Sequence, residues 1–216
     1  MTKASIDDLI EGLADELEPV RPRRVARGSL WVAAGWIGGG AALLWLSGAR
    51  HDLADGAMMP PLPMLSFWLV VALGVAAAWS ALRMGLPGVG RDYSGWRWAG
   101  LATLALPLSA LVIGFGDSHA AMEAARPENG LRCMIEGALS GLGVAAALFF
   151  WLKGGAPTSP TRAGWVIGLA AGAAGATIVA LHCASNDMIH IALWHGLAVL
   201  LSGVAGRLLL TPLLRW

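Results

Sequence analysis

The chain contains two cysteines, Cys133 and Cys183, whose thiols offer the clearest chemistry in the sequence. In an oxidising compartment a thiol pair can form a reversible disulfide, and thiolates also bind zinc, cadmium and copper ions. The alternative is that both are small buried residues that only pack against their neighbours. We interpret them as a sensing or linking pair, because the chain has only these two and the expected topology places both at one membrane face.

Carboxylate and imidazole side chains occur close to the two cysteines in the sequence. The five residues concerned are Glu136, His182, Asp187, His190 and His195. Together with thiolates these groups can bind a heavy-metal ion, so the sequence suggests a metal-responsive cluster, and a transient heavy-metal ion is the only cofactor that we expect. No C-x-x-C or H-x-x-x-H motif fixes the geometry. A lone histidine in a membrane helix is more often an interhelical hydrogen-bonding residue than a ligand.

The elements that must position these residues are membrane helices. Of the 216 residues, 56% are hydrophobic and 13% are charged, whereas a soluble domain has about 25% charged residues. About 20 apolar residues are needed to cross a bilayer, and six stretches qualify: 29–48, 64–82, 97–116, 133–152, 164–183 and 189–210. The sequence therefore predicts an all-α polytopic membrane protein, with a bundle of six transmembrane helices over 29–216.

The basic residues predict the orientation of these spans. Twelve of the 15 lysines and arginines fall on one side, and only Arg50, Arg126 and Arg132 fall on the other. Because segments rich in lysine and arginine stay in the cytoplasm, we expect a bacterial inner-membrane protein with both termini cytoplasmic. Cys133 would then begin the fourth span and Cys183 would end the fifth, both facing the periplasm.

Residues 1–28 form the expected cytoplasmic segment, with an acidic part followed by a basic one. Residues 5–18 carry six acids, and residues 19–27 carry four arginines. Ser5 to Glu18 has the spacing of an amphipathic helix, ended by Pro19. Its apolar stripe consists of Ile6, Leu9, Ile10, Leu13 and Leu17, and Asp7 and Asp8 suit the positive end of the helix dipole.

Glycines predict where the membrane helices approach one another most closely. Gly164, Gly168 and Gly172 recur at four-residue intervals in the fifth span, and Gly137 and Gly141 do so in the fourth. Such spacing is typical of packing faces in membranes, so we expect these two helices to touch.

The sequence contains no motif of a common enzyme class. It has no G-x-S-x-G, no phosphate-binding glycine loop and no H-E-x-x-H, and we predict that the protein is not an enzyme. A small metal or solute permease is the alternative function. It would need a polar path through the bilayer, yet the inner halves of the predicted spans have almost no ionisable residues.

The chain resembles the NrsF family of bacterial anti-sigma factors over nearly its whole length. The residues that carry the resemblance are Asp7-Asp8-Leu9-Ile10, Leu13-Ala14, Pro19-Val20, the arginine linker, the cysteines of the fourth and fifth spans, and Leu193-Trp194-His195. The resemblance implies a protein that sequesters an extracytoplasmic-function sigma factor at the inner membrane and contacts no nucleic acid directly. It also implicates Cys133 and Cys183 in the response to metal or oxidative stress. The H-x-x-x-C-x-x-C zinc motif of another anti-sigma class is absent.

The acidic helix gives this resemblance a mechanism. An apolar stripe can fill a groove on a sigma factor while the carboxylates face its basic DNA-binding surface, so the helix would compete with promoter DNA. The residues expected to bind the sigma factor are Ile6, Asp7, Asp8, Leu9, Ile10, Leu13 and Leu17. The alternative is an acidic juxtamembrane helix without a partner, which anionic lipid would repel.

Overall fold

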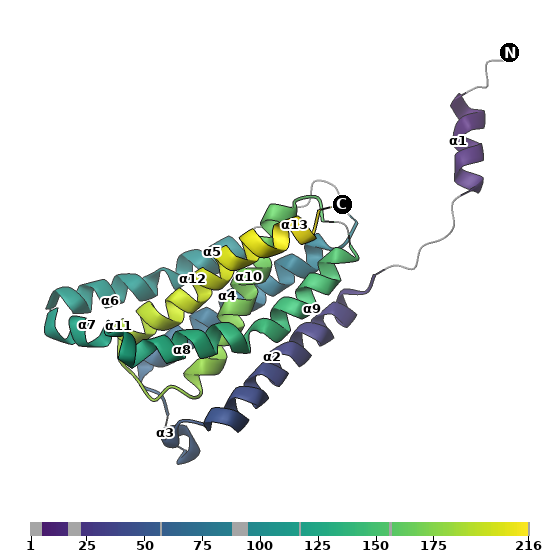
Figure 1. The fold of residues 1–216 in the computed structure, drawn as a ribbon. Coiled ribbons are helices and arrows are strands. Elements are labelled where there is room, and N and C mark those ends of the chain that lie inside the picture. Colours follow the sequence, from purple (N-terminus) through teal and green to yellow (C-terminus); the bar gives the residue numbers. More distant parts are fainter. Residues whose placement is uncertain are drawn as a thin grey trace.

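The computed structural model describes residues 6–16, 23–56, 58–87, 95–116, 118–155 and 157–215, and every regular element within these ranges is a helix (Figure 1). The longer helices are α2 (Val25–Ser47), α4 (Pro61–Met84), α5 (Gly95–Thr103), α6 (Ala105–Gly116), α8 (Pro127–Ser140), α9 (Leu142–Lys153), α10 (Pro160–Ala180) and α12 (Gly196–Ala205). The N-terminal helix α1 (Ile6–Asp15) has ten residues. The shorter elements are α3 (His51–Ala54), α7 (Ser118–Ala124), α11 (Met188–His190), α13 (Thr211–Leu213) and two π-helical segments, η1 (Ile191–His195) and η2 (Gly206–Leu210).

Five of the six expected spans are present as helical stretches long and apolar enough to cross a membrane. They are Val25–Ser47, Pro61–Met84, Gly130–Lys153, Pro160–Ala180 and Met188–Leu213. The last of them runs from α11 to α13 through both π-helical segments, which the sequence did not predict.

The third expected span, 97–116, is divided between α5 and α6. The two helices follow one another, and the break lies at Leu104 (Figure 1). Pro107 explains the break, because a proline has no N–H to bond the carbonyl oxygen of residue 103 and its ring crowds that carbonyl. Neither half is long enough on its own to span a bilayer.

Helix α10 forms the centre of the bundle. Sixteen of its 21 residues are buried, and it contacts α2, α4, α8, α9 and α12. Its residues are mostly alanine and glycine, so neighbouring backbones approach closely on all sides, as is typical of helices packed within membranes.

The structure confirms that the fourth and fifth spans touch, but it corrects the expected use of the glycines. Gly168 lies against Ser202 and Gly203 of α12, and Gly172 lies against Val199 of the same helix. The three-glycine stripe therefore faces the last span.

The contact between the fourth and fifth spans uses another part of α10. Gly137 of α8 meets Gly175, and Gly141, between α8 and α9, meets the backbone of Ala171. A Cβ atom at Gly141 or Gly175 would overlap the backbone of the opposite helix, so both positions require glycine.

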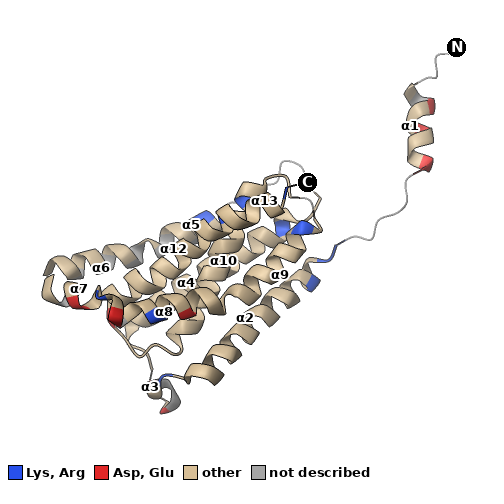
Figure 2. Ribbon diagram, in the orientation of Figure 1, with Lys and Arg blue, Asp and Glu red and all other residues tan. Residues whose placement is uncertain are grey.

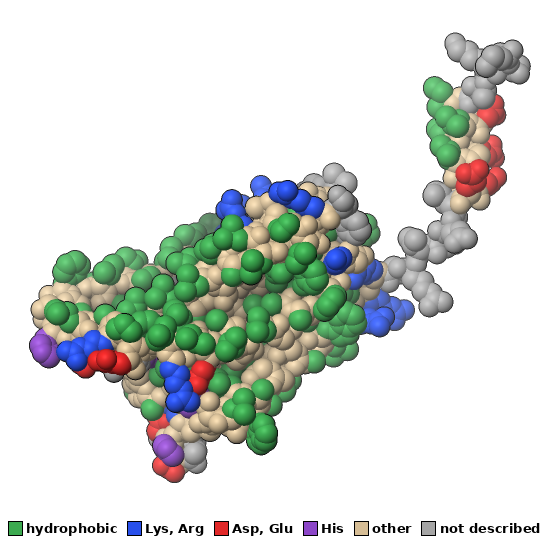
Figure 3. Space-filling model, viewed as in Figure 1, with side chains coloured by type: hydrophobic (Ala, Val, Ile, Leu, Met, Phe, Trp, Pro, Cys, Tyr) green, Lys and Arg blue, Asp and Glu red, His purple; other side chains and the backbone are tan. Residues whose placement is uncertain are grey.

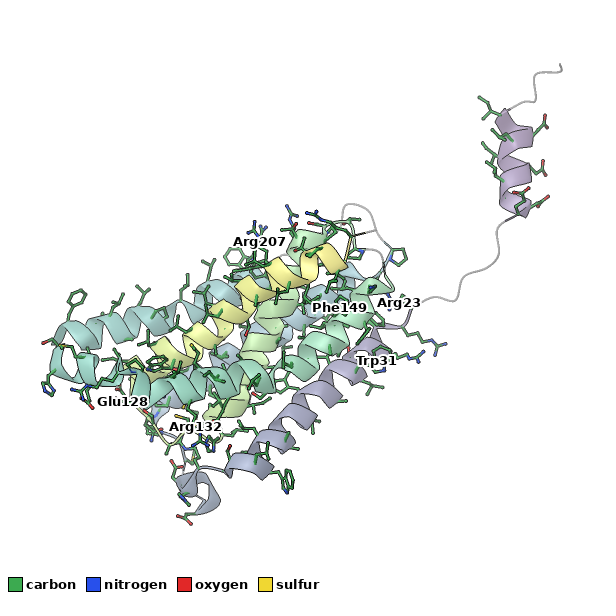
Figure 4. The ribbon with its side chains drawn as sticks, viewed as in Figure 1. Arg23, Trp31, Glu128, Arg132, Phe149 and Arg207 are labelled. Atoms are coloured by element: carbon green, nitrogen blue, oxygen red, sulfur yellow. The ribbon has the colours of Figure 1, made fainter. Side chains whose placement is uncertain are left out.

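The outside of the bundle is apolar along its length and charged toward its ends (Figures 2 and 3). Large hydrophobic side chains are exposed along it, among them Trp45 and Phe115. Arg23 and Arg207 lie at one end, and Glu128 and Arg132 lie at the other (Figure 4). Exposed apolar sides with charged ends are the pattern expected of a protein surrounded by lipid.

The N-terminal helix α1 stands apart from the bundle (Figure 1). The sequence predicted it over Ser5 to Glu18, whereas the described helix is Ile6–Asp15. Ile6, Leu9, Ile10 and Leu13 are exposed, and Figure 3 shows the apolar side chains on one side of α1 and the acidic ones on another. Leu17 and the side chain of Asp7 lie outside the described residues.

Candidate thiol and imidazole site

The two cysteines come from different parts of one end of the bundle. Cys133 lies in the first half of α8 and is partly buried. Cys183 was expected inside the fifth span, but α10 ends at Ala180 and the cysteine lies in the connection from α10 to α11. Its backbone N–H still donates to the carbonyl oxygen of Val179 (2.7 Å), which continues the end of α10.

The cysteines meet two histidines of the last span. One ligand atom from each of Cys133, Cys183, His190 and His195 can be chosen so that all four atoms lie within 4.8 Å of one another. Cys183 Sγ lies 3.4 Å from His190 Nε2. The rings of His190 and His195 are 5.7 Å apart between centroids and nearly perpendicular, at 75°. We call these four residues the thiol–imidazole cluster.

The π-helical segment η1 explains how both histidines reach the cluster. In a regular α-helix, residues five apart differ by about 140° around the axis, so His190 and His195 would point in different directions. A π-helix bonds each residue to the fifth one along, which brings residues five apart onto one face. The sequence predicted both histidines in one cluster, but it did not predict the π-helical turn that brings them together.

The cluster is buried and only partly hydrogen-bonded. Cys183, His190 and His195 are each less than a tenth exposed. Among the described residues, His195 Nε2 is a buried nitrogen without a hydrogen-bond partner. The pKa of the Cys183 thiol lies below its ordinary value, because a hydrogen bond from Cys133 and, after it, one from His190 stabilise the thiolate more than burial disfavours it.

Glu136 and His182 form a separate polar contact beside the cluster. Glu136 Oε1 accepts a hydrogen bond from Arg132 (2.7 Å), and its other oxygen lies 3.7 Å from His182 Nε2. His182 Nδ1 donates to the carbonyl oxygen of Gly48, 2.7 Å away. These two residues, which the sequence grouped with the cysteines, instead connect α8 and the α10–α11 connection to the end of α2.

Asp187 acts as a helix cap in the structure. Its Oδ1 accepts a hydrogen bond from the backbone N–H of Ile189 (2.9 Å), at the start of α11. This bond satisfies one of the free N–H groups at the helix end and fixes where the last span begins. Asp187 is therefore not among the residues that the structure brings together with the cysteines.

Arg50 is a residue of this region that sequence reasoning treated only as an outward charge. Its side chain is 3% exposed and forms two 2.6 Å hydrogen bonds to the carboxylate of Asp52. It also donates to Asn186 Oδ1 (2.9 Å), and its backbone N–H donates to the carbonyl oxygen of Leu181. Arg50 therefore holds the connection that carries Cys183, and no motif in the sequence signals this role.

A cavity of about 380 Å³ reaches the cluster from the side of α4 and α5. Cys183 and His195 line it together with mainly apolar residues such as Phe67, Leu104 and Leu200. A small molecule or ion in this cavity would have direct access to two of the four cluster residues.

Comparison with known proteins identifies the family. Residues 13–216 match the family model NrsF, described as negative regulator of sigma F. The chain is 34% identical to the anti-sigma-F factor NrsF of Caulobacter vibrioides and 30% identical to the probable anti-sigma-F factor NrsF of Azospira oryzae. Each alignment covers 97% of this chain and 99% of the relative. No solved structure matches the chain. With a match over nearly its full length, the chain belongs to the NrsF family.

Proposed function

We propose that this protein is a membrane-bound anti-sigma factor that sequesters an extracytoplasmic-function sigma factor and releases it when metal or oxidant acts on Cys133 and Cys183. The observation that carries the proposal is the full-length similarity to relatives named anti-sigma-F factors. The helical composition and the five apolar stretches support a location in the bacterial inner membrane.

The third crossing in this proposal is made by α5 and α6 together. Residues 95–116 would measure about 33 Å if the helical rise continued through the break, which is close to the ~30 Å hydrocarbon thickness. With this crossing the bundle has six spans, both termini are cytoplasmic, and the thiol–imidazole cluster faces the periplasm. The basic residues at the end of the bundle that includes Arg23 and Arg207 support this orientation (Figure 4).

Helix α1 is the proposed contact for the sigma factor. Leu9 and Leu13 are 60% and 57% exposed, although leucine gains about 1.5 to 3 kcal/mol from full burial, so a partner that covers the stripe would bind favourably. The acidic side would face the basic surface of a DNA-binding protein. The family match begins at residue 13, so the assignment of α1 rests mainly on its own chemistry.

Release requires that a change at the cluster alters the cytoplasmic side. The cluster joins α8 to the last span, and both helices pack closely on α10 through glycines. Helix α10 in turn extends toward the opposite end of the bundle. A metal ion or oxidant that stabilises one packing of these helices over another would change the affinity for the sigma factor. The change can be no larger than the difference in free energy with which the stimulus stabilises the two packings. A coupling of about 1 to 3 kcal/mol corresponds to a change of roughly 5- to 150-fold.

The permease alternative is less well supported. The cavity that reaches Cys183 has mainly apolar walls, whereas a path for ions or polar solutes needs polar groups along its length.

The experiment that tests the proposal is capture of the sigma factor by the detergent-solubilised full-length protein. In the double variant Leu9→Asp/Leu13→Asp, the loss of about 1.5 kcal/mol at each leucine should weaken binding roughly 100-fold. The matched control is Gly12→Asp/Ala14→Asp, which adds the same charge beside the stripe and should retain capture. If the leucine variant captures the sigma factor as well as the wild type does, α1 is not the main contact.

A further inference from the structure

The thiol–imidazole cluster has the composition and spacing of a tetrahedral metal site. With Zn–S bonds of about 2.3 Å and Zn–N bonds of about 2.0 to 2.1 Å, neighbouring ligand atoms in a tetrahedron are roughly 3.3 to 3.8 Å apart. The four ligand atoms here all lie within 4.8 Å of one another, so displacements on the order of 1 Å would bring them to those spacings.

The second observation is the state of His195. His195 is 5% exposed, and within the described part of the chain its Nε2 has no hydrogen-bond partner. A buried nitrogen left without a partner costs about 1 to 3 kcal/mol, so its position calls for an interaction. One of the two ring nitrogens of His195 lies in the cluster, beside two sulfur atoms and a second imidazole.

We propose that Cys133, Cys183, His190 and His195 together bind one thiophilic divalent ion, Zn²⁺ or Cd²⁺, in four-coordinate geometry. Two thiolates and two neutral imidazoles are a ligand set that prefers such ions over Mg²⁺ and Ca²⁺, which need oxygen ligands. Glu136 and Asp187 take no part, because Glu136 bonds Arg132 and Asp187 caps α11.

The charge of the complex suits its buried position. On binding, any S–H proton that the two cysteines still carry leaves to solvent and two S–metal bonds form, while nothing is oxidised or reduced. The dipositive ion and the two thiolates sum to zero, so the loaded site buries no net charge. A site with one thiolate or with an added carboxylate would leave a net charge in the bundle.

The proposed ion would connect two spans and the intervening chain. Cys133 belongs to α8, Cys183 to the α10–α11 connection, and the histidines to the last span. Its effect on sigma release rests on the function proposed above, whereas binding of the ion itself does not.

Cobalt and cadmium binding to the full-length protein in detergent tests the site. Under a phosphine reductant, Co²⁺ should bind at one ion per chain and give both thiolate-to-cobalt charge transfer and the intense visible bands of tetrahedral cobalt. Zn²⁺ and Cd²⁺ should displace it, and Mg²⁺ should not. His190→Ala and His195→Ala should each weaken binding by at least about 100-fold, since loss of even an outer-shell partner costs roughly 10- to 100-fold.

The matched control is His182→Gln. His182 precedes Cys183 in the chain but lies outside the cluster, so this variant should bind cobalt with an affinity within about threefold of the wild type. His195→Cys tests the geometry without removing a ligand, and its cobalt complex should show stronger sulfur charge transfer. Circular dichroism of each variant checks that the bundle is folded.

The proposal is overturned if cobalt binds without tetrahedral bands, if the folded histidine variants bind as tightly as the wild type, or if the reduced wild type binds no thiophilic ion. Sigma capture measured on the same preparations separates this result from the function. Capture by the metal-free protein without metal binding would refute the site alone, and metal binding by a protein whose metal-free form captures no sigma factor would refute the anti-sigma function alone.

Discussion

Replacing Arg50 with alanine should release the connection that carries Cys183. The substitution removes the two 2.6 Å bonds to Asp52 and the 2.9 Å bond to Asn186. Breaking a fully buried ion pair costs about 3 to 5 kcal/mol. Because the side chain of Asp52 is 35% exposed and can be hydrated after the change, we expect a cost below this range, about 2 to 3 kcal/mol.

Thiol labelling can measure this loss directly. In a Cys133→Ser background Cys183 is the only thiol and is 8% exposed. Its reaction with a bulky maleimide, too large to enter the cavity of about 380 Å³, requires the connection to open. A cost of about 2 kcal/mol corresponds to a roughly 30-fold greater open population and a similar increase in labelling rate. Arg50→Lys keeps the positive charge but loses the planar guanidinium group that bonds Asp52 through two nitrogens. Its labelling rate should therefore lie between those of the Cys133→Ser parent and of Arg50→Ala.

The control for this experiment is Arg126→Ala. Arg126 pairs with Glu123 and Glu128 at 3.2 and 3.6 Å, but its side chain is 58% exposed, so its loss costs only about 0 to 1 kcal/mol. Equal labelling rates in Arg50→Ala and in the parent protein would refute the view that Arg50 holds this connection.

Two further predictions concern the bundle and the response. Gly175→Ala places a methyl group against the carbonyl oxygen of Gly137 and should destabilise the bundle by about 1 to 3 kcal/mol, whereas Gly38→Ala enters open space and should not lower the unfolding temperature in detergent. Equal shifts for both variants would contradict the packing. In cells, Cys133→Ser/Cys183→Ser should abolish induction of sigma-dependent genes by cadmium or oxidant, and an unchanged response in a reporter assay would exclude the cysteines as the sensor.

Hydropathy predicted most of the fold because lipid imposes a simple requirement on each span. A run of about 20 apolar residues is visible in the sequence, and five of the six runs are long helices in the structure. The third run differs because hydropathy does not register the missing N–H of Pro107. The choice of partner for Gly168 and Gly172 was not predictable, since a small-residue stripe shows that a helix packs closely but not on which neighbour.

The candidate site was predicted in part. The proximity of Cys133 and Cys183 could be expected from their places at the ends of two spans that share a membrane face. His190 and His195 were also expected beside the cysteines, but the wider turn of η1 that brings both onto one face was not, because the sequence has no known signature for it. The burial of Arg50 was not predictable either, since it depends on Asp52 of α3 and Asn186 of the α10–α11 connection both bonding its side chain.

The burial of α10 has a consequence for how the protein is made. A ribosome synthesises α10 before α12, so the groove at Gly168 and Gly172 remains uncovered in the nascent chain until residues 196–205 have entered the bilayer. Chains truncated before that point lack the backbone that fills the groove, and we expect membrane quality-control proteases to degrade them. Insertion of α12 is thus the step that covers this face of α10.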